Sequence, residues 1–359
     1  MKRNYGIDLL RMLLMYMVVV LHILGQGGVL HSVEIRTANY YISWMLEALC
    51  FCAVNCYALI TGYVHYGRKY RMNSLLTILA QILFYSIAIY SLFWIFMPER
   101  ISFGALLNAF LPTNRVTHWF VSSYAGLFLM IPLLNAAIQA FSREQAKYFF
   151  LVFVIAYTVI PTLAMGDPYT TYGGYSTLWL MCLYIMGAFI KKYNLNEMYS
   201  VKRSISIFSL CIIITLLSKF SLEEISIMIS GESNYSEILL SYTSPTILFA
   251  GITLFLCFLN LQPGKWALRY LQKFSSAAFG VYLIHCHPYL YELMRDRFTF
   301  LTGWHPIAMS LGVICIAFGI YIPCLLIDYL RIKLFDKLHF KELIQKISNR
   351  IVPDYVSEM

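Results

Sequence analysis

Residues 6–22, GIDLLRMLLMYMVVVLH, join a long apolar run to three ionisable side chains, Asp8, Arg11 and His22. After Arg11 the chain continues to Val33 without Asp, Glu, Lys or Arg. Crossing the roughly 30 Å hydrocarbon core of a bilayer takes about 20 apolar residues in a helix. This stretch therefore predicts a transmembrane helix that begins with a charged pair and carries a histidine deep in the span.

The rest of the chain repeats this pattern. Hydrophobic residues make up 60% of the 359 residues and charged residues only 13%, whereas soluble domains are about half apolar and a quarter charged. Ten segments lack Asp, Glu, Lys and Arg: 12–33, 48–67, 72–98, 116–142, 148–166, 168–190, 204–218, 238–264, 274–291 and 298–327. Segment 204–218 is short, and we expect Lys219 to snorkel to the interface and extend it. The pattern predicts an all-α polytopic membrane bundle of about ten transmembrane helices.

The basic residues indicate the orientation of the bundle. With the N-terminus placed in the cytoplasm, 20 of the 27 Lys and Arg residues fall on that side, as the positive-inside rule requires. We therefore expect both termini to be cytoplasmic, with a transmembrane domain over 1–335 and an amphipathic tail over 336–359. The formal net charge of +9 then reflects topology and attraction to anionic membrane lipids rather than nucleic-acid binding.

The nine cysteines lie in apolar segments. Cys50 and Cys52 form a CxC without a second pair that would complete a zinc site. From this pattern we expect no metal and no disulfide.

Asp8, Arg11 and His22 are spaced to share one helix face. Asp8 and Arg11 are one turn apart and can form an ion pair, and His22 follows Arg11 by about three turns, or roughly 16 Å. An ionisable side chain at mid-helix costs roughly 2.5–3.5 kcal/mol on insertion scales, so such residues are functional candidates. The plainer interpretation is an interfacial ion pair and a histidine that bonds a neighbouring helix.

Five stretches resemble the acyltransferase-3 family. GIDLLRMLLMYMVVVLH is similar to its first-helix signature, in which an Arg is followed after ten residues by a His. YALITGYVHYGRKYR resembles the end of its second helix, with Thr61 where the family usually has serine. HWFVSSYAGLFLMIPLLN, LYIMGAFI and FSSAAFGVYLIH are similar to its fourth, sixth and ninth helices. The resemblance implies transfer of an acyl group, usually acetyl from cytoplasmic acetyl-CoA, to hydroxyls of cell-surface glycans.

With that reaction, His22 would be the catalytic group. A neutral imidazole is the cheaper state inside a membrane, and it can take the proton of the acceptor hydroxyl or hold the acyl group briefly. Arg11, paired with Asp8, would hold the CoA phosphates, supported by three basic residues of the following loop, Arg68, Lys69 and Arg71. CoA would be a co-substrate, with no cofactor bound permanently.

Aromatic and histidine side chains would form the acceptor site. Trp119 and Tyr124 could stack on sugar rings, although aromatic belts at membrane interfaces are commoner. Tyr282 and His285 share a helix face, and His285 could orient the acceptor or stabilise charge. The expected partners are acyl-CoA, a surface or lipid-linked glycan and membrane lipids, in the plasma membrane.

Two other classes of protein stay open. A flippase or polymerase of envelope polysaccharide would share the helix plan and the basic loops, and a purely structural or sensory membrane protein would also fit the composition. The identity of the acceptor, the length of the acyl group, a covalent acyl-histidine and the oligomeric state are left open by the sequence.

Overall fold

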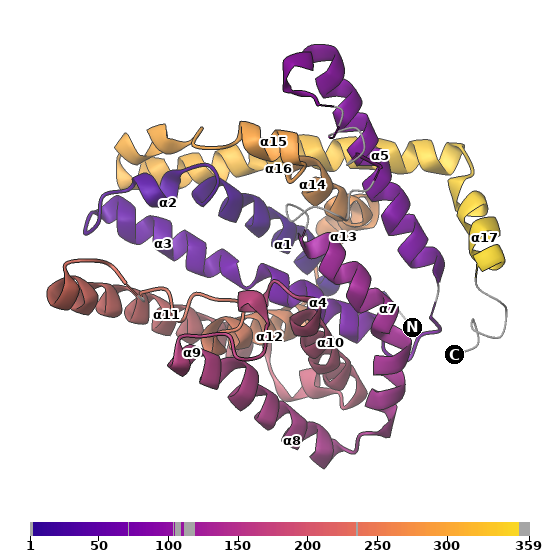
Figure 1. Ribbon diagram of the computed structural model, residues 1–359. Coiled ribbons are helices and arrows are strands. Elements are labelled where there is room, and N and C mark those ends of the chain that lie inside the picture. The colour runs from indigo at the N-terminus through magenta and orange to yellow at the C-terminus, as the bar shows by residue number, and fades with distance from the viewer. Residues whose placement is uncertain are drawn as a thin grey trace.

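The protein is an assembly of helices. The computed structural model describes residues 3–70, 72–102, 104, 109–110, 119–234 and 236–351. It is 81% helical, and the described residues form no strand (Figure 1). The prediction of an all-α bundle is therefore confirmed.

The α-helices are α1 (Tyr5–Leu24), α2 (Val29–Ser32), α3 (Ala38–Phe51), α4 (Ala53–His65), α5 (Met72–Phe96), α7 (Trp119–Ala140), α8 (Arg143–Val154), α9 (Ile160–Ala164), α10 (Thr177–Lys192), α11 (Val201–Ser230), α12 (Pro245–Asn260), α13 (Lys265–Phe274), α14 (Ala278–His285), α15 (Pro288–Leu293), α16 (Pro306–Lys337) and α17 (Phe340–Ile351). A π-helical turn, Ile155–Val159, joins α8 to α9. Short 3₁₀ turns lie at Pro98–Arg100, Tyr172–Gly174, Leu195–Met198, Ser275–Ala277 and Thr299–Gly303.

Seven helical stretches in the described residues are long and apolar enough to cross a membrane, or eight if the bent pair α12 and α13–α14 counts as one span. They account for seven of the ten predicted segments. The other three, 168–190, 238–264 and 274–291, contain α10, α12 and α14, which have only 16, 16 and 8 residues. At about 1.5 Å per residue these helices are shorter than the hydrocarbon core, so the count of about ten stays a prediction.

Two charged residues that border predicted segments lie inside helices. Glu47, which borders segment 48–67, is the tenth residue of α3 and is 8% exposed. Lys219 does not snorkel: it is 3% exposed and its Nζ lies 2.8 Å from Oε1 of Glu223, one turn further along α11. The snorkelling prediction for Lys219 is therefore wrong, because a buried carboxylate compensates the charge within the bundle.

Close helix contacts depend on small residues. A Cβ at Gly62 of α4 would lie 1.9 Å from the carbonyl oxygen of Tyr184, and one at Gly187 of α10 would lie 2.0 Å from that of Leu59. The two glycines thus allow the backbones of α4 and α10 to touch, as small residues do between membrane helices. This contact explains why position 62, in the YALITGYVHYGRKYR stretch, is a glycine.

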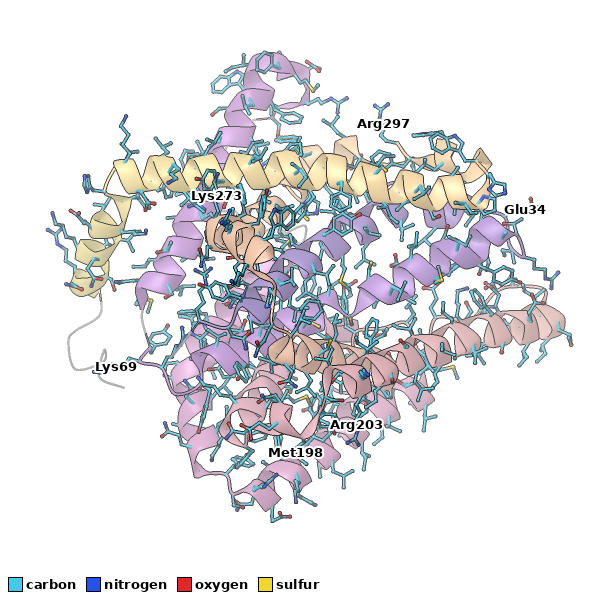
Figure 2. All side chains as sticks on the ribbon, turned by 180° about the vertical axis from the view of Figure 1, so that it is seen from behind. Glu34, Lys69, Met198, Arg203, Lys273 and Arg297 are labelled. Carbon is cyan, nitrogen blue, oxygen red and sulfur yellow. The ribbon has the colours of Figure 1, made fainter. Side chains whose placement is uncertain are left out.

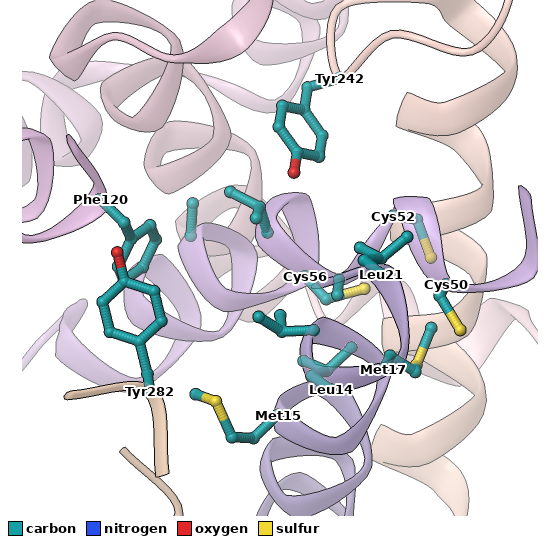
Figure 3. Packing of buried hydrophobic residues seen from close by; sticks show 14 of the residues in the cluster. Leu14, Met15, Met17, Leu21, Cys50, Cys52, Cys56, Phe120, Tyr242 and Tyr282 are labelled. Carbon is teal, nitrogen blue, oxygen red and sulfur yellow. The ribbon is translucent and has the colours of Figure 1, made fainter. Parts of the chain in front are cut away.

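Helix α1 lies in the centre of the bundle and contacts α3, α4, α12, α14 and α16. Figure 3 shows its apolar side chains, including Leu14 and Met17, beside the cysteines of α3 and α4. All nine cysteines are free. The central position of α1 places the polar side chains of the opening stretch inside the protein.

The predicted cytoplasmic ends of several helices meet at one end of the bundle. Arg3 donates to Ser275 Oγ at 2.9 Å, Asn4 donates to the Leu259 carbonyl at 3.1 Å, and Lys191 donates to the Tyr66 carbonyl at 2.5 Å. Figure 2 shows basic side chains, among them Lys69, Arg203 and Lys273, on the surface. The side of the membrane on which this end lies stays a prediction.

The C-terminal boundary lies close to the predicted one. Helix α16 runs through position 335 and ends at Lys337, and α17 then turns away from it. Side chains of α17 and α5 bond, since Asn73 donates to Gln345. The described part of the tail is therefore a helix that packs against the bundle, and the division at 335 stays a prediction.

Candidate active site

One face of α1 lines two cavities. The first, of about 360 Å³, contains His22 and is called the His22 cavity. The second, of about 320 Å³, contains Asp8 and Arg11 and is called the Arg11 cavity. Arg11, whose side chain is 35% exposed, and the half-buried His22 therefore line cavities on the same side of the helix.

The His22 cavity is mostly aromatic. Its walls come from α1, α3, α4, α7, α14 and α15, from the segments that follow α1 and α14, and from the loops before α10 and α12. The lining residues are Met15, Val18, Leu21, His22, Gly25, Gln26, Glu47, Phe51, Val54, Tyr57, Trp119, Phe120, Tyr175, Tyr242, Phe279, Tyr282, Cys286 and Tyr291. Figure 3 shows the rings of Phe120 and Tyr282 together on one side and the hydroxyl of Tyr242 pointing toward α1. Among the described residues of this lining, Glu47 is the only acidic one, and none is Lys or Arg.

A hydrogen-bond chain fixes the imidazole of His22. Nδ1 of His285 lies 2.6 Å from the carbonyl oxygen of Val281 and must donate to it. Nε2 of His285 then carries a lone pair and accepts from Nδ1 of His22 at 3.0 Å. This assignment of protons, made from the hydrogen-bond pattern, leaves the lone pair of His22 on Nε2. His22 is thus arranged as a proton acceptor.

Cys286 completes a cluster of three possible metal ligands. Its Sγ lies 3.5 Å from Nδ1 of His22 and 3.4 Å from Nε2 of His285. The three ligand atoms lie within 4.8 Å of one another, and thiolate and imidazole are the ligands that Zn²⁺ prefers. The cluster can hold a metal ion, and the expectation of none from the sequence stays a prediction.

The Arg11 cavity carries positive charge. Asp8 Oδ2 lies 2.6 Å from Nε of Arg3, and Asp8 Oδ1 lies 3.5 Å from an Nη of Arg11. Arg68 also lines the cavity. Two guanidinium groups therefore flank one carboxylate and a third lines the same cavity, which suits a phosphate-bearing ligand.

Tyr57 lies where the two cavities approach each other. Its ring lines the His22 cavity, and its hydroxyl donates to the carbonyl oxygen of Arg11 at 2.7 Å. One side chain of α4 thus contacts both the lining of the His22 cavity and the backbone of Arg11.

The sequence model of the acyltransferase-3 family, described as an acyltransferase domain, matches residues 4–328, nearly the whole chain. The chain belongs to the acyltransferase-3 family. Comparison with curated proteins and with solved structures finds no significant match. The protein is therefore a multi-pass membrane acyltransferase, and the match favours this activity over a flippase or polymerase.

The acyltransferase brings together most of the residues predicted from its sequence. His285 bonds His22, Trp119 and Tyr282 line the His22 cavity, and Arg68 lines the Arg11 cavity. Tyr124 does not line the His22 cavity, but it stacks on Phe120, which does, with ring centroids 5.7 Å apart. Lys69 is exposed and lines neither cavity, and Arg71 lies outside the described residues.

Most lining residues of the acyltransferase were not predicted, among them Glu47, Tyr175, Tyr242 and Cys286. Glu47 had a signal, since Tyr40, Ser43 and Glu47 are buried on one face of α3 at helical spacing. Tyr175 and Tyr242 lie in loops, and no periodicity indicates where a loop side chain points. Cys286 directly follows His285, yet only the end of α14 turns both side chains toward His22.

Proposed function

We propose that the protein is an O-acyltransferase that moves an acyl group, in the first place acetyl, from cytoplasmic acyl-CoA to a hydroxyl of a cell-surface or lipid-linked glycan. The observation that carries this proposal is the His22–His285–Val281 chain, which leaves Nε2 of His22 free to accept a proton. The proposed location is the plasma membrane, with both termini in the cytoplasm.

The reaction follows from this arrangement. The oxygen of the acceptor hydroxyl attacks the thioester carbonyl, and Nε2 of His22 takes the proton of that hydroxyl. The carbon–sulfur bond breaks, an ester forms, and the imidazolium returns the proton to the CoA sulfur. The hydrogen bond from His22 Nδ1 to His285 holds the ring in the required tautomer, as the third group does in hydrolytic triads.

The different linings of the two cavities support this assignment of substrates. The Arg11 cavity, with Arg3, Arg11 and Arg68, is suited to the phosphates of CoA, whose thioester lies at the end of a long flexible arm. The His22 cavity, lined by aromatic rings, is suited to a sugar. Arg11 and His22 are separated by about 16 Å along α1, a distance that the arm of CoA would have to bridge past Tyr57.

The test is replacement of His22. His22→Ala should lower acyl transfer by at least about 100-fold, the usual contribution of a general base, while the protein stays in the membrane. The readout is mass spectrometry of surface glycans and the consumption of acetyl-CoA by membranes. His339→Ala is the matched control, because His339 is exposed and pairs with Glu342 on the surface. Full acylation by the His22 variant would overturn the proposal.

A further inference from the structure

His22, His285 and Cys286 have the spacing of zinc ligands. In a tetrahedral site, Zn–N bonds of about 2.0–2.1 Å and Zn–S bonds of about 2.3 Å place two nitrogens about 3.3 Å apart and a nitrogen and a sulfur about 3.6 Å apart. The observed separations are 3.0 Å between Nδ1 of His22 and Nε2 of His285, and 3.5 and 3.4 Å from these two atoms to Sγ of Cys286. An ion among the three atoms therefore reaches all of them after small shifts of the side chains.

A second hydrogen bond orients His285 for metal binding. Its Nδ1 donates to the Val281 carbonyl at 2.6 Å, so its Nε2 presents a lone pair toward the other two ligand atoms. Metal-binding histidines almost always donate from their other ring nitrogen in this way, to a carboxylate, a backbone carbonyl or water. His22 and Cys286 also line the His22 cavity, which gives an ion a route to the cluster.

The surroundings of Cys286 distinguish it from the other cysteines. Among the described residues, its cluster is the one group of three His, Cys, Asp or Glu side chains whose ligand atoms lie within 4.8 Å of one another. The lone pair on Nε2 of His285 already accepts from Nδ1 of His22, so neither nitrogen offers the thiol a free lone pair. Three ligand atoms thus share one proton, whereas a metal ion would bond all three.

We propose that His22, His285 and Cys286 bind Zn²⁺ reversibly and that the bound ion inhibits acyl transfer by changing the tautomer of His22. Coordination by Nδ1 of His22 moves the ring proton to Nε2, which is the base in the proposed function on which the inhibition rests. Sγ of Cys286 releases its proton to water. The thiolate then cancels one of the two charges of the ion, and an anion from solution in the fourth position cancels the other. Thiolate and imidazole ligands favour Zn²⁺ over Mg²⁺ and Ca²⁺.

Cobalt(II) in place of zinc reports the ligands directly. Full-length protein without a polyhistidine tag, in lipid nanodiscs, is titrated with Co²⁺. We expect a thiolate-to-cobalt charge-transfer band in the near ultraviolet and the intense visible bands of a tetrahedral site, both removed by Zn²⁺ and unaffected by Mg²⁺. Cys286→Ser should lose the charge-transfer band, and its Zn²⁺ affinity, measured by competition with a fluorescent chelator, should fall about 100-fold or more, since loss of a mere supporting partner costs about 10–100-fold. Cys315→Ser is the matched control, because Cys315 is an exposed cysteine.

The metal spectrum and acetyl transfer are measured separately. Zn²⁺ should inhibit transfer over the concentration range in which it displaces Co²⁺. Absence of the charge-transfer band, or a band that persists in Cys286→Ser, would overturn the metal site, while transfer that is still lost in His22→Ala would leave the proposed function intact. Displacement of Co²⁺ by Zn²⁺ without inhibition would overturn the tautomer change. Full transfer by His22→Ala, with the cobalt spectrum of the unmodified protein intact, would overturn the proposed function and keep the metal site.

Discussion

At the scale of single residues, the position of a proton decides what His22 can do. The imidazole of His285 is held between the Val281 carbonyl and Nδ1 of His22, at 2.6 and 3.0 Å. His285 therefore acts through His22 as a positioning residue. The sequence suggested instead that His285 contacts the acceptor, yet His285 is not among the residues that line the cavity.

Removing His285 should weaken catalysis without weakening donor binding. We expect His285→Ala to lower kcat by about 10- to 100-fold, as loss of an orienting partner does elsewhere, and to leave the KM for acetyl-CoA unchanged. His285→Gln, whose amide oxygen can accept from His22, should recover part of the rate. A KM effect equal to the kcat effect, or no rescue by glutamine, would contradict this role. Steady-state kinetics on purified protein measure both constants.

The cluster of His22, His285 and Cys286 allows a prediction about metals. If His22 works as a base, chelation with 1,10-phenanthroline should leave acetyl transfer unchanged. Added Zn²⁺ should inhibit, because it would bind the donor atoms of His22, His285 and Cys286, which lie within 4.8 Å of one another. Cys286→Ser should weaken this inhibition and keep activity. Loss of activity on chelation, restored by Zn²⁺, would show that the site needs a metal.

At the scale of elements, α14 depends on a close approach to α16. A Cβ at Gly280 would lie 2.1 Å from Cγ of Asp328. That carboxylate accepts from Tyr85 at 2.8 Å and from Gln81 at 3.0 Å, so it ties α16 to α5 as well. The packing of α14 against α16, and with it the position of His285, therefore depends on Gly280.

Gly280→Ala should displace either Asp328 or the whole of α14. We expect a loss of about 1–3 kcal/mol of stability, typical of overpacking, together with reduced acetyl transfer. Gly319→Ala in α16 is the control, because nothing lies within 4 Å of its Cβ position and alanine favours a helix. Thermal unfolding in detergent gives the comparison. Equal Tm values for the two variants would argue against the contact.

A comparison of the predicted and observed helices shows which features can be predicted from the sequence. Apolar runs predicted the helices and the α1 spacing predicted the shared face of Arg11 and His22, because both depend on local periodicity. Glu47 and Lys219 were assigned to span ends, because a charge interrupts an apolar run whether it meets water or a buried partner. Only tertiary contacts distinguish these cases: Lys219 has Glu223, whereas Glu47 faces a cavity.

At the scale of the whole molecule, one helix connects two sites of opposite character. The Arg11 cavity is cationic and the His22 cavity is aromatic with one carboxylate. Such a division suits an anionic donor at one site and an uncharged ring at the other. The hydrogen bond from Tyr57 to the Arg11 carbonyl, at 2.7 Å, lies between them.

This division predicts that donor and acceptor affinities can be changed separately. Arg11→Ala removes one of three guanidinium groups from the Arg11 cavity and should raise the KM for acetyl-CoA about tenfold or more, because a charge-assisted bond to phosphate contributes about 1.5–3 kcal/mol. The KM for the acceptor should change by less than about twofold, because Arg11 is not in the lining of the His22 cavity. Arg36→Ala is the matched control, since Arg36 pairs with Glu224 on the surface. Kinetics with each substrate varied in turn decide the matter: an unchanged acetyl-CoA KM, or equal changes for both substrates, would mean that the two cavities do not divide the substrates between them.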